Sequence, residues 1–381
     1  MRVVLITPGF AADEADWCIP AVTTLVRGLA ARHEVRVFAL RYPFRSESYQ
    51  IAGARVRAFG GAHSGGIGRL VLLRRAYRHL VTALEQEPCD VVHGLWADEP
   101  GRLAVAVARC LGTPAVVSLL GGELVGIRDI RYGAQLSLLG RGFVRTALRR
   151  AEVVTVGSSF LGRLAARSAG ARLRLAALGV DTTLFQPTDA ASPLVLSGRP
   201  PILHVASLAP VKDQAMLLRA FGRLLRDFPA ACLHVIGDGP ARGQVVSRAA
   251  DLGMAGSVHF HGSVAHHLLP AYYRAASFCV LSSRFESQGM VVLEAAACSR
   301  TTVGPEVGVL PELVPAVVTV PAGDDEALAA AMADLSRDPE HALTLGRDAM
   351  AMVRSSFDLA TCLSRFEAIY GAVGPRAAAH A

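Results

Sequence analysis

The feature that most constrains this chain is a regular alternation between short, apolar, β-branched runs and longer helical stretches. In the N-terminal half the apolar runs have strand length, and the segments between them have the apolar spacing of helices. The expected strands lie at 3–6, 35–39, 55–59, 90–93, 115–119, 152–156 and 172–177. The expected helices lie at 18–32, 66–87, 98–111, 133–150 and 158–169. Such alternation is typical of a parallel sheet covered by helices.

The same alternation restarts after a segment that interrupts it. Residues 179–201 are rich in Gly, Pro, Ser, Thr and Asp, which is typical of a linker. The second set of expected strands lies at 202–206, 232–236, 258–260, 278–281, 301–303 and 317–320. The expected final helices lie at 324–336, 339–354 and 359–373.

A chain of 381 residues exceeds one ordinary domain, so the pattern predicts an α/β protein with two parallel-sheet domains that face each other across a cleft. We expect an N-terminal domain at 1–185 and a C-terminal domain at 190–357. We also expect the last helix, at about 358–381, to return to the N-terminal domain.

Composition excludes several classes of protein. With 52% hydrophobic and 19% charged residues, the chain has the composition of a globular protein and not of a disordered one. The N-terminus passes from one Arg directly into a strand-like run without the pattern of a secretory signal, and no apolar run has membrane-spanning length. Seven scattered cysteines without a C-x-x-C pair argue against disulfides and structural zinc. We therefore expect a cytoplasmic protein.

Charge is distributed unevenly along the chain. Residues 1–190 hold 24 Arg against 15 acidic residues, a net charge of +9, whereas the rest of the chain has a net charge of −2. The positive field of the N-terminal half would steer an anionic acceptor or an acidic membrane surface toward it. The alternative is that these arginines only form a solvated basic face. Nothing in the sequence indicates a nucleic-acid partner.

One expected helix, at 68–85, combines an apolar stripe with arginines. It either lies on anionic lipid or, more simply, packs its stripe on the sheet. The stripe consists of Leu70, Leu73, Tyr77, Leu80, Val81 and Leu84, and the arginines are Arg74, Arg75 and Arg78.

The segment ESQGMVVLE at 286–294 carries the best chemical signal. Gly289 stands at the expected start of a helix, with Glu286 before it and Glu294 two turns along it. Two carboxylates placed in this way can hold hydroxyl groups at opposite ends of a folded nucleotide sugar. The free amides of the helix start would face the diphosphate between them. Taken alone, the spacing between the two glutamates would usually indicate a solvated helix face.

Several segments together resemble glycosyltransferase family 4, a family of retaining enzymes with the GT-B fold. The resemblance covers nearly the whole chain, although it is less sharp in the N-terminal half. The segments are LGVDTTLFQP at 178–187, VASLAPVKDQAMLLRAF at 205–221, VIGDGP at 235–240, VHFHGSV at 258–264, YYRAASFCVLSSRFESQGMVVLEAAAC at 272–298 and VGVLPELV at 307–314.

This resemblance implies a role for each matching residue. Glu294 would bind the ribose hydroxyls, Glu286 would bind the transferred sugar, and Lys212 would bind the diphosphate and stabilise the charge of the leaving group. The implied backbone contacts come from Gln288, Gly289 and Met290 to the sugar, and from Gly262, Ser263 and Val264 to the nucleobase.

Lys212 is the only lysine of the chain, against 38 arginines. A GC-rich genome explains the bias, and a lysine that persists under it indicates a need for a compact ammonium, or chance. The family usually carries an Arg five residues before this Lys, where Ser207 stands here. A hydroxyl brings no charge, so either another Arg supplies it or diphosphate binding is weaker.

The N-terminal half departs from the family at the reaction centre. The segment SLLGGEL at 118–124 has Leu120 where the family commonly has the His of a His-Gly pair. Glu123 is then the main candidate of this half for contact with the sugar or the acceptor, and a cap or a surface charge is the alternative. We group it with Glu286 and Lys212 as catalytic candidates.

Two further residues are candidates for acceptor contact. Asp16 lies in an acidic loop at 8–20, where a carboxylate near the acceptor hydroxyl would act as a base or set specificity. The alternative is that the segment is an ordinary polar loop. His93 ends an expected strand at the edge where open α/β sheets bind ligands, unless it is a core histidine. The histidines at 259, 261, 266 and 267 lack the companions of a metal site, so we predict neither metal nor cofactor.

Taken together, these features suggest retaining transfer of a hexose-type sugar from a nucleoside diphosphate, with uridine as the expected base, to a cell-envelope saccharide or a lipid-linked acceptor. The rivals are a non-catalytic nucleotide-sugar-binding protein, which Leu120 and Ser207 would favour, and a sugar-nucleotide epimerase of the same fold. A Rossmann oxidoreductase is disfavoured, because no G-x-G-x-x-G follows the first strand.

Overall fold

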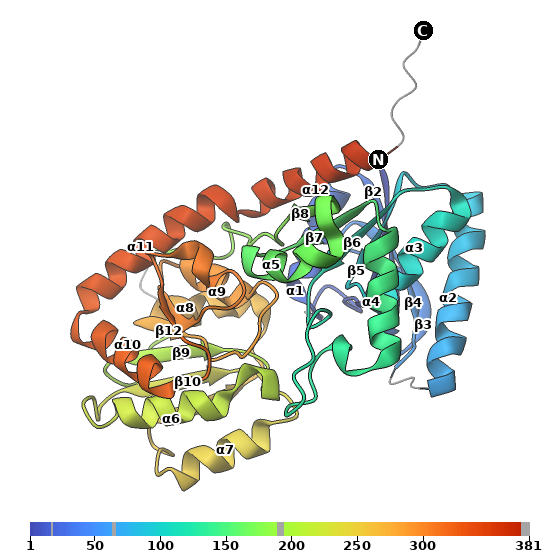
Figure 1. The fold of residues 1–381 in the computed structure, drawn as a ribbon. Helices are drawn as coiled ribbons and strands as arrows, with labels where there is room; N and C mark the ends of the chain where they lie inside the picture. Colours follow the sequence, from blue (N-terminus) through green and yellow to red (C-terminus); the bar gives the residue numbers. More distant parts are fainter. Residues whose placement is uncertain (17, 63–65, 189–193, 375–381) are drawn as a thin grey trace. The chain divides into compact units, whose positions relative to one another are not determined.

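The computed structural model describes residues 1–16, 18–62, 66–188 and 194–374, and it divides the chain into two compact units (Figure 1). Unit 1 consists of Met1–Gly179 together with Leu359–Ala381, and unit 2 consists of Val180–Asp358. The expected final helix at 358–381 is observed to residue 373, and its last residues, 375–381, lie outside the described part.

Unit 1 is built on an eight-stranded sheet within the described residues, in the order β3-β4-β2-β1-β5-β6-β7-β8. Its neighbouring strands pair in parallel, except that β3 runs antiparallel to β4. The strands are β1 (Arg2–Gly9), β2 (Glu34–Tyr42), β3 (Ser46–Ile51), β4 (Ala54–Phe59), β5 (Val91–Leu95), β6 (Ala115–Leu119), β7 (Val153–Val156) and β8 (Leu173–Leu175).

Strand β3 is not among the expected strands. Its sequence SESYQI is polar at alternate positions, and it pairs with β4 on one side only, at the edge of the sheet. The apolar content that reveals a buried strand is therefore missing.

The helices of unit 1 lie between its strands along the chain, except α12, which follows unit 2. They are α1 (Pro20–Ala30), α2 (Gly66–Gln86), α3 (Glu99–Leu111), η1 (Ala134–Leu136), α4 (Leu138–Arg150), α5 (Ser159–Ala169), η2 (Gly170–Arg172) and α12 (Leu359–Val373). The helix expected at 133–150 is broken at Ser137, whose extended backbone separates η1 from α4 and whose hydroxyl accepts the Gly140 amide at 2.9 Å. Serine is a preferred residue at a helix N-cap, so α4 starts there.

Helix α2 buries a stripe different from the expected one. Its buried residues are Leu72, Ala76, Leu80 and Leu84. They follow each other at a spacing of four residues, so they line one face of the helix. Leu70, which belongs to the expected stripe, is 56% exposed. The first turns of α2 therefore leave large apolar side chains uncovered.

Unit 2 is built on a six-stranded parallel sheet within its described residues, in the order β11-β10-β9-β12-β13-β14. The strands are β9 (Pro201–Val205), β10 (Cys232–Ile236), β11 (Val258–Gly262), β12 (Phe278–Val280), β13 (Thr302–Pro305) and β14 (Val318–Val320). The helical segments are η3 (Pro210–Lys212), α6 (Gln214–Leu224), α7 (Arg242–Asp251), η4 (His266–Leu268), α8 (Leu269–Ala275), α9 (Met290–Ala297), η5 (Leu310–Leu313), α10 (Asp325–Arg337) and α11 (Pro339–Ser356).

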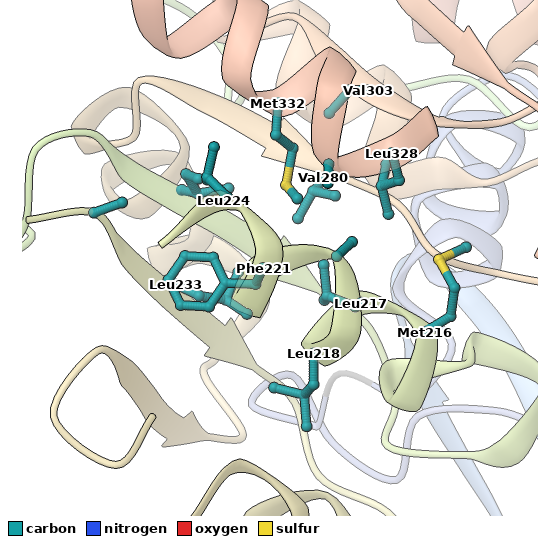
Figure 2. Close-up of a cluster of buried hydrophobic side chains, with 14 of the residues drawn as sticks. Met216, Leu217, Leu218, Phe221, Leu224, Leu233, Val280, Val303, Leu328 and Met332 are labelled. Carbon is teal, nitrogen blue, oxygen red and sulfur yellow. The ribbon is translucent and has the colours of Figure 1, made fainter. Parts of the chain in front are cut away.

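A hydrophobic core joins the sheet of unit 2 to helices α6 and α10 (Figure 2). Phe221 and Leu217 of α6 point toward the strands, and Met332 of α10 completes the cluster. Each buried side chain of this size contributes about 1.5–3 kcal/mol when it leaves water. Because this core fixes α6 on the sheet, it also fixes the turn that precedes α6.

None of the helices in the described ranges combines the length and the apolar character that crossing a bilayer requires.

Candidate functional site

Lys212 lies in a tight turn between β9 and α6. The turn is closed by Asp213, whose backbone is left-handed (φ 46°) and whose carboxylate accepts the Met216 amide at 3.1 Å. The side-chain amide of Gln214 donates to the Ser207 carbonyl at 3.0 Å. Ser207 itself is exposed. The turn therefore presents one cation, Lys212. Five residues earlier, where the family usually carries an Arg, Ser207 presents a hydroxyl.

Lys212 and Glu286 form a direct ion pair. The Lys212 Nζ donates to Glu286 Oε1 at 2.5 Å, and the Ser283 hydroxyl donates to the same oxygen at 2.6 Å. The two charged side chains are 21% and 11% exposed, so the pair is reachable from solvent. A further hydroxyl, that of Ser282, donates to the Lys212 carbonyl at 2.6 Å. Both serines, which the sequence did not single out, thus hold the pair in place.

The loop that carries Glu286 and Gln288 is shaped by two glycines with positive φ. Gly289 (φ 86°) is the N-cap of α9, and Gly308 (φ 60°) lies against the loop from the other side. A Cβ on Gly308 would stand 2.4 Å from the Gln288 carbonyl oxygen, which accepts the Val309 amide at 2.7 Å. The close approach of these two segments fixes the loop at the start of α9, where a Cβ on Gly289 would stand 3.7 Å from the Glu286 Cγ.

Gln288 and Met290 stand at opposite sides of this N-cap. Gln288 is only 4% exposed, and its side-chain amide donates to the Met290 sulfur at 3.2 Å. The role that the family resemblance implies for both residues is a backbone contact, which a buried side chain does not prevent.

Glu294 is held by two residues that the sequence did not assign to it. His266 Nε2 donates to Glu294 Oε1 at 3.0 Å, and the Tyr273 hydroxyl donates to Oε2 at 2.8 Å. The ring of Phe185 contacts both partners, at centroid distances of 5.1 Å and 6.0 Å. An ionised carboxylate has about four acceptor positions, so Glu294 can still receive hydroxyl donors.

These partners carried a signal in the sequence. Phe185 belongs to the segment at 178–187 that resembles the family, and His266 belongs to the histidine group considered only for metal binding. What could not be read from the sequence is that His266 contacts Glu294 and that Phe185 packs on His266 and on Tyr273, the other partner of Glu294.

A buried histidine ties the Lys212 turn to the sheet. His204 on β9 donates through Nδ1 to the Val280 carbonyl at 2.9 Å, and its Nε2 lies 3.5 Å from the Gln214 side-chain amide. Burial lowers the pKa of His204 to about 4, so the ring is neutral near pH 7. It therefore positions the turn and adds no charge to the site.

The residues expected near the nucleobase follow strand β11. Gly262 ends that strand with φ 68° and accepts the Gly237 amide at 2.8 Å. Gly237 in turn approaches the neighbouring strand so closely that a Cβ would stand 1.9 Å from the Ala206 carbonyl oxygen. Ser263 is exposed and Val264 is partly exposed, so both are accessible beside this turn.

Glu123, the main candidate of unit 1, is buried and accepts backbone amides of its own loop and of the segment that follows β5. Its Oε1 accepts the amides of Ala97 and Leu120 at 3.1 Å, and its Oε2 accepts the Gly121 amide at 2.7 Å. Only 2% of the residue is exposed. This geometry favours the cap over contact with sugar or acceptor. Burial raises the pKa of Glu123 to about 7.

His93 is a core histidine in this structure. It is fully buried, and its two ring nitrogens lie 2.7 Å from the hydroxyl oxygens of Tyr370 and Ser118. Burial lowers its pKa to about 3. Both nitrogens are engaged and no part of the ring reaches solvent, so the expected acceptor contact is replaced by a structural role.

Asp16 organises the acidic loop. Its Oδ2 accepts the Ala12 amide at 2.8 Å and the Tyr42 hydroxyl at 2.7 Å, and its Oδ1 accepts the Cys18 amide at 2.9 Å. Three local donors favour a polar loop element over a catalytic base.

In the described ranges, no three His, Cys, Asp or Glu side chains gather as metal ligands. Two of the four histidines considered for metal, His259 and His261, instead stack on His234 at centroid distances of 4.9 Å and 5.3 Å.

Solved structures share this architecture. Sucrose-phosphate synthase of Thermosynechococcus elongatus superposes with a TM-score of 0.80 at 20% identity, over 97% of this chain and 98% of that one. The Anabaena protein HepE, in complex with UDP-glucose, superposes with a TM-score of 0.75 at 17% identity, over 98% of this chain and all of that one. Two Rossmann-like α/β units of this kind define the GT-B class of fold.

Sequence comparison places the chain within that class. Residues 19–174 match the family model described as glycosyl transferase 4-like domain, and residues 199–338 match the one described as glycosyl transferases group 1. A GDP-mannose-dependent alpha-(1-6)-phosphatidylinositol monomannoside mannosyltransferase of Mycolicibacterium smegmatis is 32% identical over 261 residues, which cover 62% of this chain and 68% of the relative.

A D-inositol 3-phosphate glycosyltransferase of Frankia alni is 32% identical over 58% of either chain, so the match spans less than two thirds of that relative. The chain belongs to glycosyltransferase family 4, and the residues grouped around Lys212, Glu286 and Glu294 lie on the motifs that carried the resemblance.

Proposed function

We propose that this glycosyltransferase moves a hexose-type sugar, with retention, from a nucleoside diphosphate sugar to a saccharide or lipid-linked acceptor of the cell envelope, on the cytoplasmic side. The observation that carries the proposal is the grouping in unit 2 of a lysine, a hydroxyl-binding carboxylate and a helix start beside it. Family membership supports glycosyl transfer, and retention rests on the family resemblance.

In this proposal each residue acts at a separate part of the donor. Glu294 accepts the ribose hydroxyls, and Glu286 accepts hydroxyls of the sugar. The Lys212 ammonium neutralises charge on the diphosphate as the bond from the anomeric carbon to the phosphate oxygen breaks. The acceptor oxygen bonds to the same face of that carbon, and its proton passes to the departing diphosphate. The protein then needs no nucleophile of its own and no metal.

For the base, three mannosyltransferase relatives are named GDP-mannose-dependent, so GDP-mannose is the first donor that we propose. A uridine nucleotide sugar, the expectation from the sequence, is the second.

Donor binding tests the proposal through thermal stability. A nucleotide sugar present at about 100 times its Kd should stabilise the fold by about 2.7 kcal/mol. Glu294→Ala should abolish this shift, because a ribose contact is lost. Glu340→Ala, which removes an exposed carboxylate from α11 of the same unit, should keep it.

Three outcomes separate the alternatives. A shift that survives Glu294→Ala unchanged would show that the ribose assignment is wrong. Binding without transfer or donor hydrolysis across a broad acceptor panel would identify a non-catalytic binder. Isomerised sugar in the absence of any acceptor would identify an epimerase. For a transfer product, the anomeric configuration measured by NMR decides between retention and inversion.

A further inference from the structure

The carboxylate of Glu294 is largely enclosed, and each of its two oxygens has its own donor. The side chain is only 8% exposed. The Tyr273 hydroxyl donates to Oε2 at 2.8 Å, and His266 Nε2 lies 3.0 Å from Oε1. Within the described residues, no arginine or lysine pairs with this carboxylate. The position of Glu294 is therefore set by the hydrogen bonds that it accepts.

Tyr273 is the permanent member of this pair of donors. It is 1% exposed and lies on α8, which packs against α9, the helix of Glu294 (Figure 1). Burial, together with the charge of Glu294, raises the pKa of Tyr273 well above its ordinary value. The phenol therefore keeps its proton near neutral pH and donates to Oε2. One oxygen of Glu294 is in this way held from the protein interior.

His266 is the more exposed of the two donors. Its side chain is 20% exposed, and it belongs to the short helix η4 that precedes α8. A carboxylate oxygen only accepts, so Nε2 carries the proton of this hydrogen bond. The buried ring of Phe185 meets the His266 ring edge-on at a centroid distance of 5.1 Å, which limits the movement of the imidazole. The direction of the second donor is thus fixed as well.

Two donors fix the plane of a carboxylate, whereas one donor does not. If Tyr273 alone held Glu294, the carboxylate could turn about the Oε2 contact, and the free acceptor positions would have no fixed direction. With His266 in place, the acceptor positions that remain on both oxygens are fixed. The vicinal hydroxyls of a ribose need acceptors at defined angles. An acceptor that is ordered in advance binds them more tightly, because no side chain has to be ordered on binding.

We propose that His266 is a positioning residue of the donor site and that, through Glu294, it strengthens the preference of this enzyme for ribose over deoxyribose. The inference rests on the proposed function, in which Glu294 accepts the ribose hydroxyls. His266 orders the acceptor and does not itself touch the ribose. Its loss therefore weakens most the ligands that carry both hydroxyls.

Binding of free nucleotides tests this role without any sugar transfer. The Kd values of GDP and 2′-deoxy-GDP, and of UDP and 2′-deoxy-UDP, are measured by isothermal titration calorimetry. A hydroxyl bonded to a charged group contributes about 10- to 100-fold in affinity, so the wild type should prefer the ribonucleotide by about that ratio. His266→Ala should lower the ratio by about two- to tenfold, the cost of ordering a side chain that is no longer held.

Two further variants separate the hydrogen bond from the bulk of the ring. His266→Gln keeps an N–H donor near the position of Nε2 and should retain most of the preference for the ribonucleotide. The matched control is His267→Ala, which removes the exposed imidazole next in the chain and should leave the preference unchanged. All variants are first compared by circular dichroism and thermal unfolding, so that loss of fold is not taken for loss of selectivity.

The outcomes separate this inference from the proposed function. If Glu294→Ala binds both nucleotides equally while His266→Ala keeps the full preference, Glu294 binds the ribose and the role of His266 is refuted. If Glu294→Ala keeps the preference, or if the wild type binds none of these nucleotides, the ribose contact of the proposed function is wrong and this inference fails with it.

Two other results would overturn the role of His266 alone. Tighter binding of the ribonucleotide by His266→Ala would show that the imidazole occupies an acceptor position that the ribose needs. An equal fall in the ratio for His267→Ala would show that any change in η4 has this effect, and that the hydrogen bond to Glu294 is not its cause.

Discussion

Lys212 illustrates how one residue depends on its neighbours. Its ammonium is fixed by Glu286, and its backbone by Ser282, so the charge stands at one point beside the start of α9. Ser207 is exposed and uncharged where the family carries an Arg. In the proposed reaction, Lys212 would therefore neutralise more of the diphosphate charge by itself.

Replacing Lys212 should therefore affect the chemical step more than donor binding. We expect Lys212→Ala to lower kcat by about 10²–10³, the cost of removing one electrostatic group that acts in the transition state. Lys212→Arg should recover part of this loss, because it restores charge but not a compact ammonium. Steady-state kinetics with a saturating acceptor measure both values. A raised KM with unchanged kcat would mean that Lys212 only binds the donor.

Glu123 gives unit 1 a dependence on pH. Burial raises its pKa from an ordinary value of 4.5 to about 7. Between these two values the folded chain holds a proton that the unfolded chain has released. The contribution of this group to stability is therefore full below about pH 4.5 and is lost as the pH rises through 7.

Glu123→Gln should remove this dependence, because an amide does not titrate. The free energy of unfolding, measured by urea denaturation from pH 5 to pH 8, should fall more steeply with pH for the wild type than for the variant. Parallel curves would show that Glu123 titrates at an ordinary pKa in the folded protein.

At the scale of elements, the loop before α9 depends on Gly308, which lies in the family-like segment at 307–314 but to which the sequence assigned no role. Gly308 combines φ 60° with an approach in which a Cβ would stand 2.4 Å from the Gln288 carbonyl oxygen. Any side chain there must move the loop that carries Glu286 and Gln288.

Gly308→Ala should therefore lower stability by about 2–4 kcal/mol and weaken donor binding as well. The matched control is Gly243→Ala in α7, where a Cβ meets nothing within 4 Å. This second change should raise stability by about 0.4–1 kcal/mol. Chemical denaturation compares the two variants, and equal effects would argue against close packing at Gly308.

Elements with a strong apolar period were predictable, whereas those set by local contacts were not. The buried parallel strands are mostly apolar, with one polar residue in each of β5, β6 and β10, so their positions could be predicted from the sequence pattern. The edge strand β3 pairs through its backbone while alternate residues of it are exposed, and the break at Ser137 depends on a single hydroxyl.

The site shows the same division. Lys212, Glu286 and Glu294 were proposed as site residues from motifs, and the structure pairs Lys212 with Glu286. Their supports, Ser283 and Tyr273, lie in the same motif segment at 272–298, but the sequence does not show which carboxylate each of them contacts. Conversely, His93 and Glu123 are of residue types that are common in catalysis, but both are buried and have structural roles. Their burial could not be predicted from the sequence.

At the scale of the whole molecule, the last helix packs in the unit that the first residues of the chain form. Helix α12 belongs to unit 1, where Leu363 lies beside Gly28 of α1 and Tyr370 contacts His93 on β5. Phe366 and Tyr370 are fully buried. Residues separated by hundreds of positions therefore share one core, while all of unit 2 is inserted between them.

This insertion sets an order for synthesis on the ribosome. Unit 2 is one continuous segment, Val180–Asp358, so all of its strands and helices are available before α12 is translated. Unit 1 begins first and finishes last, because the pocket that Phe366 and Tyr370 fill stays open until residues 359–373 emerge. Throughout translation of the inserted unit, the nascent first unit exposes that pocket, and this interval is when a chaperone would have most to protect.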